Sequence, residues 1–196
     1  MLKLYYAPGA CSLSDHIALL ETGLPFEIVK VDLHAKLTEK GGDFLAVNPK
    51  GYVPALVFEN GDVLTENVAV LDWIAGRFPP LAVEGALGRS RLLEVLAFVS
   101  AELHVRFGPF WHGGTSGELA AARDMIVKRL SFLAGTMRGG YLFGPSPTVA
   151  DFYLFVMLRW AKHFDIPIPA SLLRLMDRLR QRPSVQAALN REGLDL

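Results

Sequence analysis

The chain has 196 residues, of which 51% are hydrophobic, and its 20 basic residues balance its 20 acidic residues. A net charge of zero argues against nucleic acid or an anionic membrane as an electrostatic partner. The sequence contains no run of about 18 apolar residues, the length that a helix needs to span a bilayer. The chain enters a predicted strand almost at once, without signal-peptide features, and its one cysteine cannot form an intramolecular disulfide, so we expect a cytoplasmic protein.

The first predicted elements surround that single cysteine. Residues 2–6 have the pattern of a short strand, a turn follows, and an apolar spacing typical of a helix begins near Leu13. Cys11 therefore falls where a loop enters a helix, and there the free N–H groups and the helix dipole favour an anion. This position predicts a lowered thiol pKa and a reactive thiolate. The alternative is an unreactive, packed cysteine.

A second strand is expected directly after the first helix. Gly23 should end the helix, and residues 26–32 alternate in polarity and include β-branched side chains. A helix that joins two strands favours a parallel pair. Residues 33–48 are polar and contain at most a short helix around Phe44.

A hairpin and a helix complete the first 78 residues. The hairpin is predicted over residues 55–65, with Asn60-Gly61 at its tip, and helical spacing follows Glu66-Asn67. The order β-α-β and then β-β-α is the thioredoxin-like arrangement. Pro79-Pro80 ends it, and residues 79–87 are expected to form a linker.

Residues 88–196 contain no convincing strand and predict an all-α domain. An apolar stripe predicts a first helix, which Gly108-Pro109 should end or kink. A second helix is expected over about 119–137, and two more over 170–191. Between them, a capping box at residues 148–151 opens a helix that is apolar on most faces and should form the buried centre of the domain.

Six motifs occur in order over nearly the whole chain: Tyr6 to Leu13, Asn48 to Leu56, Leu64 to Asn67, Glu102 to His104, Thr148 to Asp151, and Arg182 to Val185. Together they resemble a bacterial glutathione transferase, and the beta class most of all. The resemblance implies an α/β thioredoxin-like N-terminal domain followed by an all-α C-terminal domain. It also implies conjugation of glutathione, as a co-substrate, to small and largely apolar electrophiles, with no tightly bound cofactor.

The resemblance also implies how glutathione is held. A cis Val53–Pro54 bond would leave the Val53 backbone free to pair with the tripeptide, although a plain trans turn is the alternative. Residues 66–67 would bind the γ-glutamyl carboxylate and amine at a helix start, unless Asn67 only caps the helix. Lys36 would reach the glycine carboxylate, or else be solvated. The complete predicted set is Tyr6, Lys36, Tyr52, Val53, Pro54, Glu66 and Asn67.

Two residues are implied to be catalytic, Cys11 and His104. In the beta class the matching histidine faces the cysteine across the domain boundary, where an imidazole could donate to a thiolate or relay a proton. Four aromatic residues could wall a pocket for the second substrate, or simply pack in the core: Phe107, Phe110, Trp111 and Trp160. The histidines have no spacing typical of metal ligands, so no metal site is predicted.

The sequence departs from the family pattern near the glutathione site. Tyr52 stands where the beta class often has Gln, and Asn67 replaces a smaller Ser or Gly. Ala97 and Val105 stand where polar family residues reach the glutathione of a neighbouring subunit. These departures put in doubt the affinity for glutathione and the contact of one subunit with the glutathione of the other. They bear less on the class of reaction.

Two questions stay open at the level of sequence. Cys11 could form a mixed disulfide with glutathione, so conjugation and thiol–disulfide exchange are both compatible with the residues. A non-enzymatic glutathione-binding or ligand-binding scaffold is the alternative function. The family resemblance implies a homodimer, and Phe98 and Ala101 lie off the apolar stripe of their helix, where a partner could cover them together with Val63 and Leu64.

Overall fold

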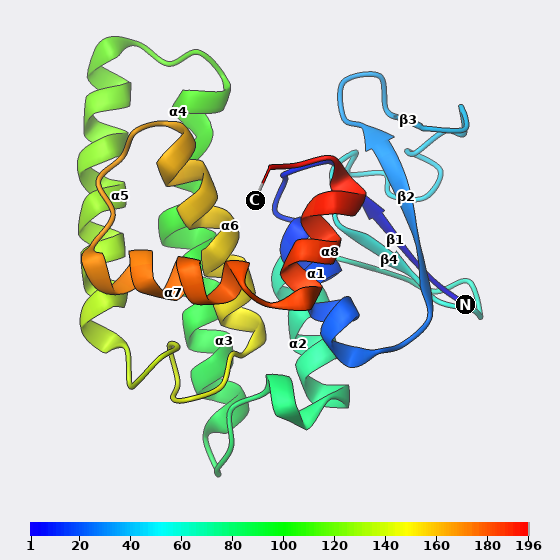
Figure 1. The fold of residues 1–196 in the computed structure, drawn as a ribbon. Coiled ribbons are helices and arrows are strands. Elements are labelled where there is room, and N and C mark those ends of the chain that lie inside the picture. Colours follow the sequence, from blue (N-terminus) through cyan, green and yellow to red (C-terminus); the bar gives the residue numbers. More distant parts are fainter. Residues whose placement is uncertain (196) are drawn as a thin grey trace.

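The computed structural model describes residues 1–195. Its N-terminal half is a five-stranded sheet in the order β3-β2-β1-β4-β5, and two helices lie between this sheet and the C-terminal helices (Figure 1). The elements of this half are β1 (Leu2–Tyr6), α1 (Leu13–Thr22), β2 (Phe26–Asp32), β3 (Leu37–Thr38), β4 (Ala55–Val57), β5 (Val63–Thr65) and α2 (Asn67–Arg77).

The strand pairing confirms the thioredoxin-like arrangement. β1 runs parallel to β2, as a strand–helix–strand connection requires, while β4 pairs antiparallel with both β1 and β5. Gly23 ends α1 in the left-handed conformation, with φ of 71°. The polar segment 33–48 contains the two-residue strand β3, which is too short for a recognisable alternation. Phe44 is buried in this segment and stacks on Tyr5, with ring centroids 5.7 Å apart.

The C-terminal half is all helical, which confirms the predicted fold class. After the short helix η1 (Pro79–Leu81), the elements are α3 (Gly88–Phe98), η2 (Val99–Leu103), η3 (His104–Phe107), α4 (Gly108–Trp111), α5 (Ser116–Thr136), α6 (Val149–His163), α7 (Ala170–Arg180) and α8 (Pro183–Glu192). Within residues 1–195, none of these helices combines the length and apolar character that crossing a membrane requires.

The irregularity in the first C-terminal helix comes earlier than Gly108-Pro109. The chain changes from α-helix to a π-helical turn at Val99 and to a 3₁₀ turn at His104. Such π turns inside helices often occur at functional sites, because the altered hydrogen bonding redirects side chains. Here the irregular segment carries Ser100 and His104, and both side chains line the same cleft.

One continuous hydrophobic core joins the two halves. It runs from Leu4 of β1 through Ile17 of α1 and the buried helix α6 to Leu189 of α8. Figure 1 shows α6 (gold) and α8 (red) beside α1. Because α1 packs on α6 and α8, the loop that carries Cys11 is placed by both halves of the molecule.

Candidate active site

A cleft of about 790 Å³ lies between the two halves, and most of the predicted site residues line it. From the N-terminal half these are Cys11, Tyr52, Val53, Pro54, Glu66 and Asn67, and from the C-terminal half His104, Trp111 and Trp160. The cleft wall also contains residues that the sequence reasoning missed, among them Leu33, Val68, Ser100, His112 and Tyr153.

Cys11 does not have the predicted chemistry. Its Sγ lies 3.6 Å from the carbonyl oxygen of Val53, which can accept a weak S–H hydrogen bond. Burial, and then the nearby Asp15 carboxyl group, raise the pKa of Cys11 to about 12, although backbone N–H groups at the helix start act in the opposite direction. The predicted thiolate is therefore wrong: desolvation outweighs the helix dipole, and the thiol is protonated at neutral pH.

We expect Cys11 of the folded protein to react slowly with iodoacetamide or oxidised glutathione at pH 7.5. The reason is that the thiolate is the nucleophile and a raised pKa leaves very little of it. Mass spectrometry over time would measure the added mass, with the same protein in urea as the fast-reacting control. Rapid labelling of the native protein at pH 7.5 would contradict the raised pKa.

The Val53–Pro54 bond is cis, which confirms what the resemblance implied. Both residues are buried and form part of the cleft wall. Beyond them, Glu66 has a φ of 75°, the left-handed conformation that non-glycine residues rarely adopt, directly before α2 begins. This backbone turns the Glu66 side chain toward the surface near residues 50–52.

Two neighbours hold the Glu66 carboxylate. Its Oε1 atom accepts a hydrogen bond from the Tyr52 hydroxyl at 2.9 Å and contacts the Lys50 ammonium group. Chiefly because of the Lys50 hydrogen bond, the pKa of Glu66 is lowered, so this carboxylate is charged at neutral pH. Lys50 was missed, although it lies inside the motif from Asn48 to Leu56 that carried the resemblance.

The Asn67 side chain is turned inward rather than capping α2. The acceptors around it assign the orientation of the amide group. The amide nitrogen faces Asp15 Oδ2 at 2.6 Å and the Cys11 carbonyl oxygen at 3.2 Å, and the Ser14 hydroxyl lies beside it. The N-cap position is occupied by Glu66, without a side-chain capping bond. Asn67 therefore ties α2 to the start of α1 underneath the cleft, and the alternative that it caps the helix is wrong.

Four predicted site residues do not line the cleft. Tyr6 is buried beside His16, with ring centroids 6.0 Å apart. The Lys36 ammonium donates to the carbonyl oxygen of Gly51 at 2.7 Å, one residue before the cleft wall. Phe107 is fully buried, and Phe110 packs on Phe164, with ring centroids 4.9 Å apart. For these two phenylalanines the alternative of ordinary core packing holds.

His104 is set in an aromatic corner of the cleft. Its Nδ1 lies 2.7 Å from the Tyr153 hydroxyl oxygen, and its ring meets Trp160 edge to face at 4.9 Å. Burial lowers the pKa of His104 to about 4, so the imidazole is neutral at pH 7. Tyr153 belongs to the apolar helix α6, where helical periodicity predicts only a core residue.

The loop before Cys11 is held from the helical half. The Trp160 indole N–H donates to the Gly9 carbonyl oxygen at 2.8 Å, and Glu192 Oε2 accepts from the Gly9 N–H at 3.0 Å. Glu192 Oε1 also lies 2.9 Å from His16 Nδ1, and neither of these two side chains is exposed. The backbone N–H and the carbonyl group of Gly9, two residues before Cys11, are thus both tied to residues more than 150 positions away.

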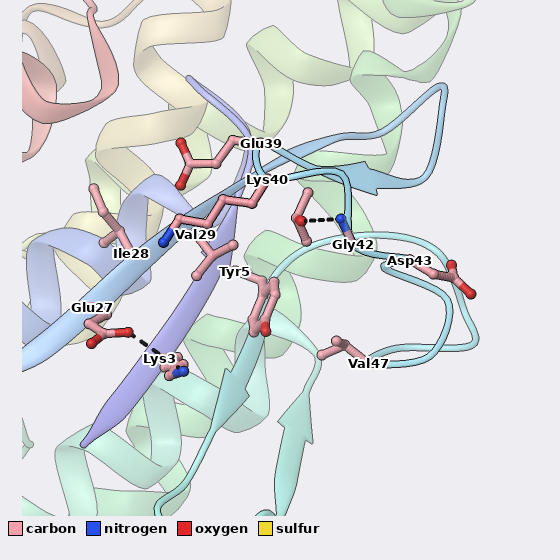
Figure 2. A pocket seen from close by; sticks show the side chains of 11 residues that line it. Lys3, Tyr5, Glu27, Ile28, Val29, Glu39, Lys40, Gly42, Asp43 and Val47 are labelled. Atoms are coloured by element: carbon pink, nitrogen blue, oxygen red, sulfur yellow. Dashed lines mark hydrogen bonds and ion pairs between the residues drawn. The ribbon is translucent and has the colours of Figure 1, made fainter.

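A separate hollow of about 430 Å³ lies on the side of the sheet away from the helices (Figure 2). Side chains of β1 and β2 form its floor, including Tyr5 and the ion pair of Lys3 with Glu27 at 3.7 Å. It shares no residue with the cleft, and no predicted site residue lines it. Within residues 1–195 no group of three His, Cys, Asp or Glu side chains is placed to hold a metal ion.

Comparisons with known proteins agree with this geometry. The profile of the family described as "Glutathione S-transferase, N-terminal domain" matches residues 10–77, and that of "Glutathione S-transferase, C-terminal domain" matches residues 68–191. The chain is 39% identical to glutathione S-transferase GstA of Escherichia coli O157:H7 over 200 residues, covering 98% of this chain and 100% of that protein.

Solved structures give the same result. The ternary complex of BphK, a bacterial glutathione S-transferase, matches with a TM-score of 0.93 at 43% identity, over 98% of this chain and 100% of that one. The beta-class glutathione S-transferase of Sphingomonas chungbukensis matches with a TM-score of 0.90 at 44% identity, again over 98% and 100% of the two chains.

Proposed function

Since this chain belongs to the glutathione S-transferase family, we propose that it conjugates the glutathione thiol to small, largely apolar electrophiles in the cleft between its two halves. One observation carries the proposal: the polar residues expected to hold glutathione and the aromatic residues expected to face an electrophile line one cleft of about 790 Å³. In the reaction, the glutathione thiol gives its proton to water. The thiolate sulfur then bonds to the electrophilic carbon, and the leaving group departs with the bonding electron pair.

Glutathione would lie along the N-terminal wall of the cleft. The Val53 backbone would pair with the tripeptide, and the charged Glu66 carboxylate would accept from the γ-glutamyl amine. Lys50 beside Glu66 is a cation within reach of the same end of the ligand. Lys36 would be a second cation near the tripeptide. Its ammonium group is bonded to Gly51, the residue directly before Tyr52 in the cleft wall.

Conjugation is favoured over thiol–disulfide exchange. Exchange through Cys11 would need its thiolate, and the pKa of about 12 opposes that form. His104 is neutral at pH 7, lines the cleft and can stabilise the sulfur of glutathione by a hydrogen bond. Trp111 and Trp160 would pack against the apolar part of the electrophile.

An assay with glutathione and a chloro-nitroarene tests this function directly. The enzyme should release chloride and form the conjugate at a rate that saturates with both substrates. Thiol exchange would be measured in parallel with a small disulfide. Glutathione binding without turnover on a panel of electrophiles and disulfides would instead support the scaffold alternative.

Two variants should separate binding from chemistry. We expect Glu66→Gln to raise KM for glutathione about tenfold, because a charge-assisted hydrogen bond to the substrate is weakened before and during reaction. His104→Ala should lower kcat about tenfold with little change in KM, since a bond to the reacting sulfur is lost. Steady-state kinetics measure both, with Glu59→Gln on the exposed hairpin as control. Equal effects of both variants on kcat alone would rule out this division.

We also propose a homodimer. The ring centroids of Phe98 and Phe132 lie 5.0 Å apart in a tilted arrangement, and Phe132 on α5 is 56% exposed, so these two rings form an apolar patch on the helical half. Val63 on the edge strand is 43% exposed. A second copy that covers such patches about a twofold axis would close the assembly. Light scattering should give about twice the chain mass of 21.5 kDa. A monomer with full activity would contradict the dimer.

A cytoplasmic role in detoxification is consistent with these features. Glutathione and reduced thiols belong to that compartment. The single cysteine needs no oxidising environment.

A further inference from the structure

The two ring nitrogens of His104 have different surroundings. Nδ1 lies 2.7 Å from the Tyr153 hydroxyl oxygen, whereas Nε2 has no hydrogen-bond partner among residues 1–195. A neutral imidazole carries one proton, on either nitrogen. Since His104 lines the cleft, the position of that proton decides whether the free nitrogen offers a ligand a donor or an acceptor.

The surroundings of Tyr153 place the proton of this hydrogen bond on oxygen. Tyr153 is buried in α6, and burial raises its pKa, so the phenol keeps its proton. Among residues 1–195, His104 Nδ1 is the hydrogen-bond partner of the Tyr153 hydroxyl group, and a proton on Nδ1 would leave the buried phenol proton without an acceptor. The phenol proton therefore points at Nδ1. A separation of 2.7 Å is typical of an O–H donor and short for an N–H donor.

We propose that Tyr153 is a positioning residue that holds His104 as the Nε2–H tautomer, so that the free nitrogen presents a hydrogen-bond donor to the cleft. The inference rests on the proposed function in one respect, that the ligand of this donor is the sulfur of glutathione. A protonated Nε2 cannot accept the thiol proton. His104 therefore stabilises the sulfur anion after ionisation, and the proton leaves to water rather than to the histidine.

Nuclear magnetic resonance of the ¹⁵N-labelled protein without substrate tests the tautomer. Long-range ¹H–¹⁵N spectra at pH 7 separate a protonated ring nitrogen from an unprotonated one, and the His104→Ala spectrum identifies the signals of His104. We expect an unprotonated Nδ1 and a protonated Nε2. A protonated Nδ1 would overturn the proposal, whatever the enzymatic activity.

The variant Tyr153→Phe tests the role of the hydroxyl group. The His104 nitrogens should shift toward a mixture of both tautomers, and kcat should fall about tenfold while KM for glutathione changes less than about twofold. Tyr141→Phe removes a hydroxyl from another buried tyrosine outside the cleft and is the matched control. An unchanged tautomer and kcat in Tyr153→Phe would refute the role of Tyr153.

The two experiments also keep this inference separate from the proposed function. If the protein shows no transferase activity but His104 is the Nε2–H tautomer, only the function fails. If conjugation is efficient and Nδ1 carries the proton, the function stands and the assignment to Tyr153 falls. If Tyr153→Phe does not fold, the spectrum of the unmodified protein still decides the tautomer.

Discussion

Replacing Glu192 by alanine is expected to lower the free energy of unfolding by about 2–5 kcal/mol, because two buried donors lose their acceptor and each such loss costs about 1–3 kcal/mol. The carboxylate is unexposed and accepts from His16 Nδ1 at 2.9 Å and from the Gly9 N–H at 3.0 Å. Alanine leaves both groups buried without their acceptor, and His16 Nε2 already lacks a partner within residues 1–195. Equilibrium unfolding in urea at pH 7 measures the change.

Activity should fall together with this stability. Gly9 is two residues before Cys11, and its backbone loses one of its two hydrogen bonds to the helical half, the other being the one from Trp160. Glu192→Gln keeps the shape and one acceptor oxygen, so we expect it to retain part of the lost stability. Arg191→Ala, at the exposed neighbouring position, is the matched control. A loss below about 1 kcal/mol in Glu192→Ala would mean that the buried contacts contribute no more than an exposed pair.

Replacing Asp151 by alanine should cost about 3 kcal/mol or more. Its carboxylate accepts three hydrogen bonds in the interior, from the N–H groups of Leu142 and Thr148 at 2.8 Å each and from the Thr148 hydroxyl at 2.9 Å. Each buried donor that loses its partner costs about 1–3 kcal/mol. Urea unfolding measures the change, with Asp124→Ala at an exposed position of α5 as control. A loss equal to that of the control would contradict the capping role.

The same residue gives a pH dependence with a definite sign. Burial raises the pKa of Asp151 to about 6, so between pH 4 and 6 the folded state keeps a proton that the unfolded state releases. Stability contributed by this group is therefore present at low pH and is lost as the pH rises toward 6, with no further change above. As the pH rises from 4 to 6, the free energy of unfolding of the unmodified protein should therefore fall relative to that of Asp151→Asn. A difference that does not vary with pH would show an ordinary pKa.

Much of the fold could be predicted because its signals are local. A short run with aromatic residues marks β1, alternating residues mark β2, Asn60-Gly61 marks the hairpin, and Gly23 ends α1, since each reflects the backbone preference of a few neighbouring residues. The two-residue strand β3 gave no such signal, because its pairing with β2 rather than its own composition defines it.

The candidate site divides in the same way. The motifs placed Val53, Glu66 and His104 by resemblance, and all three line the cleft. The resemblance could not show that the Lys50 ammonium contacts the Glu66 carboxylate or that Asn67 turns inward. Those contacts depend on side-chain directions across separate segments.

The sequence by itself determined the thioredoxin-like and helical halves, the family and the position of Cys11 at a helix start. Only the tertiary structure decided what that position means chemically. The pKa of a thiol depends above all on its burial, and Cys11 packs against the core that the two halves share. In the same way, the partners of Gly9 and His104 come from α6 and α8, far along the chain. Periodicity reports which face of a helix is buried, but the partner of each buried polar group is set by packing between elements.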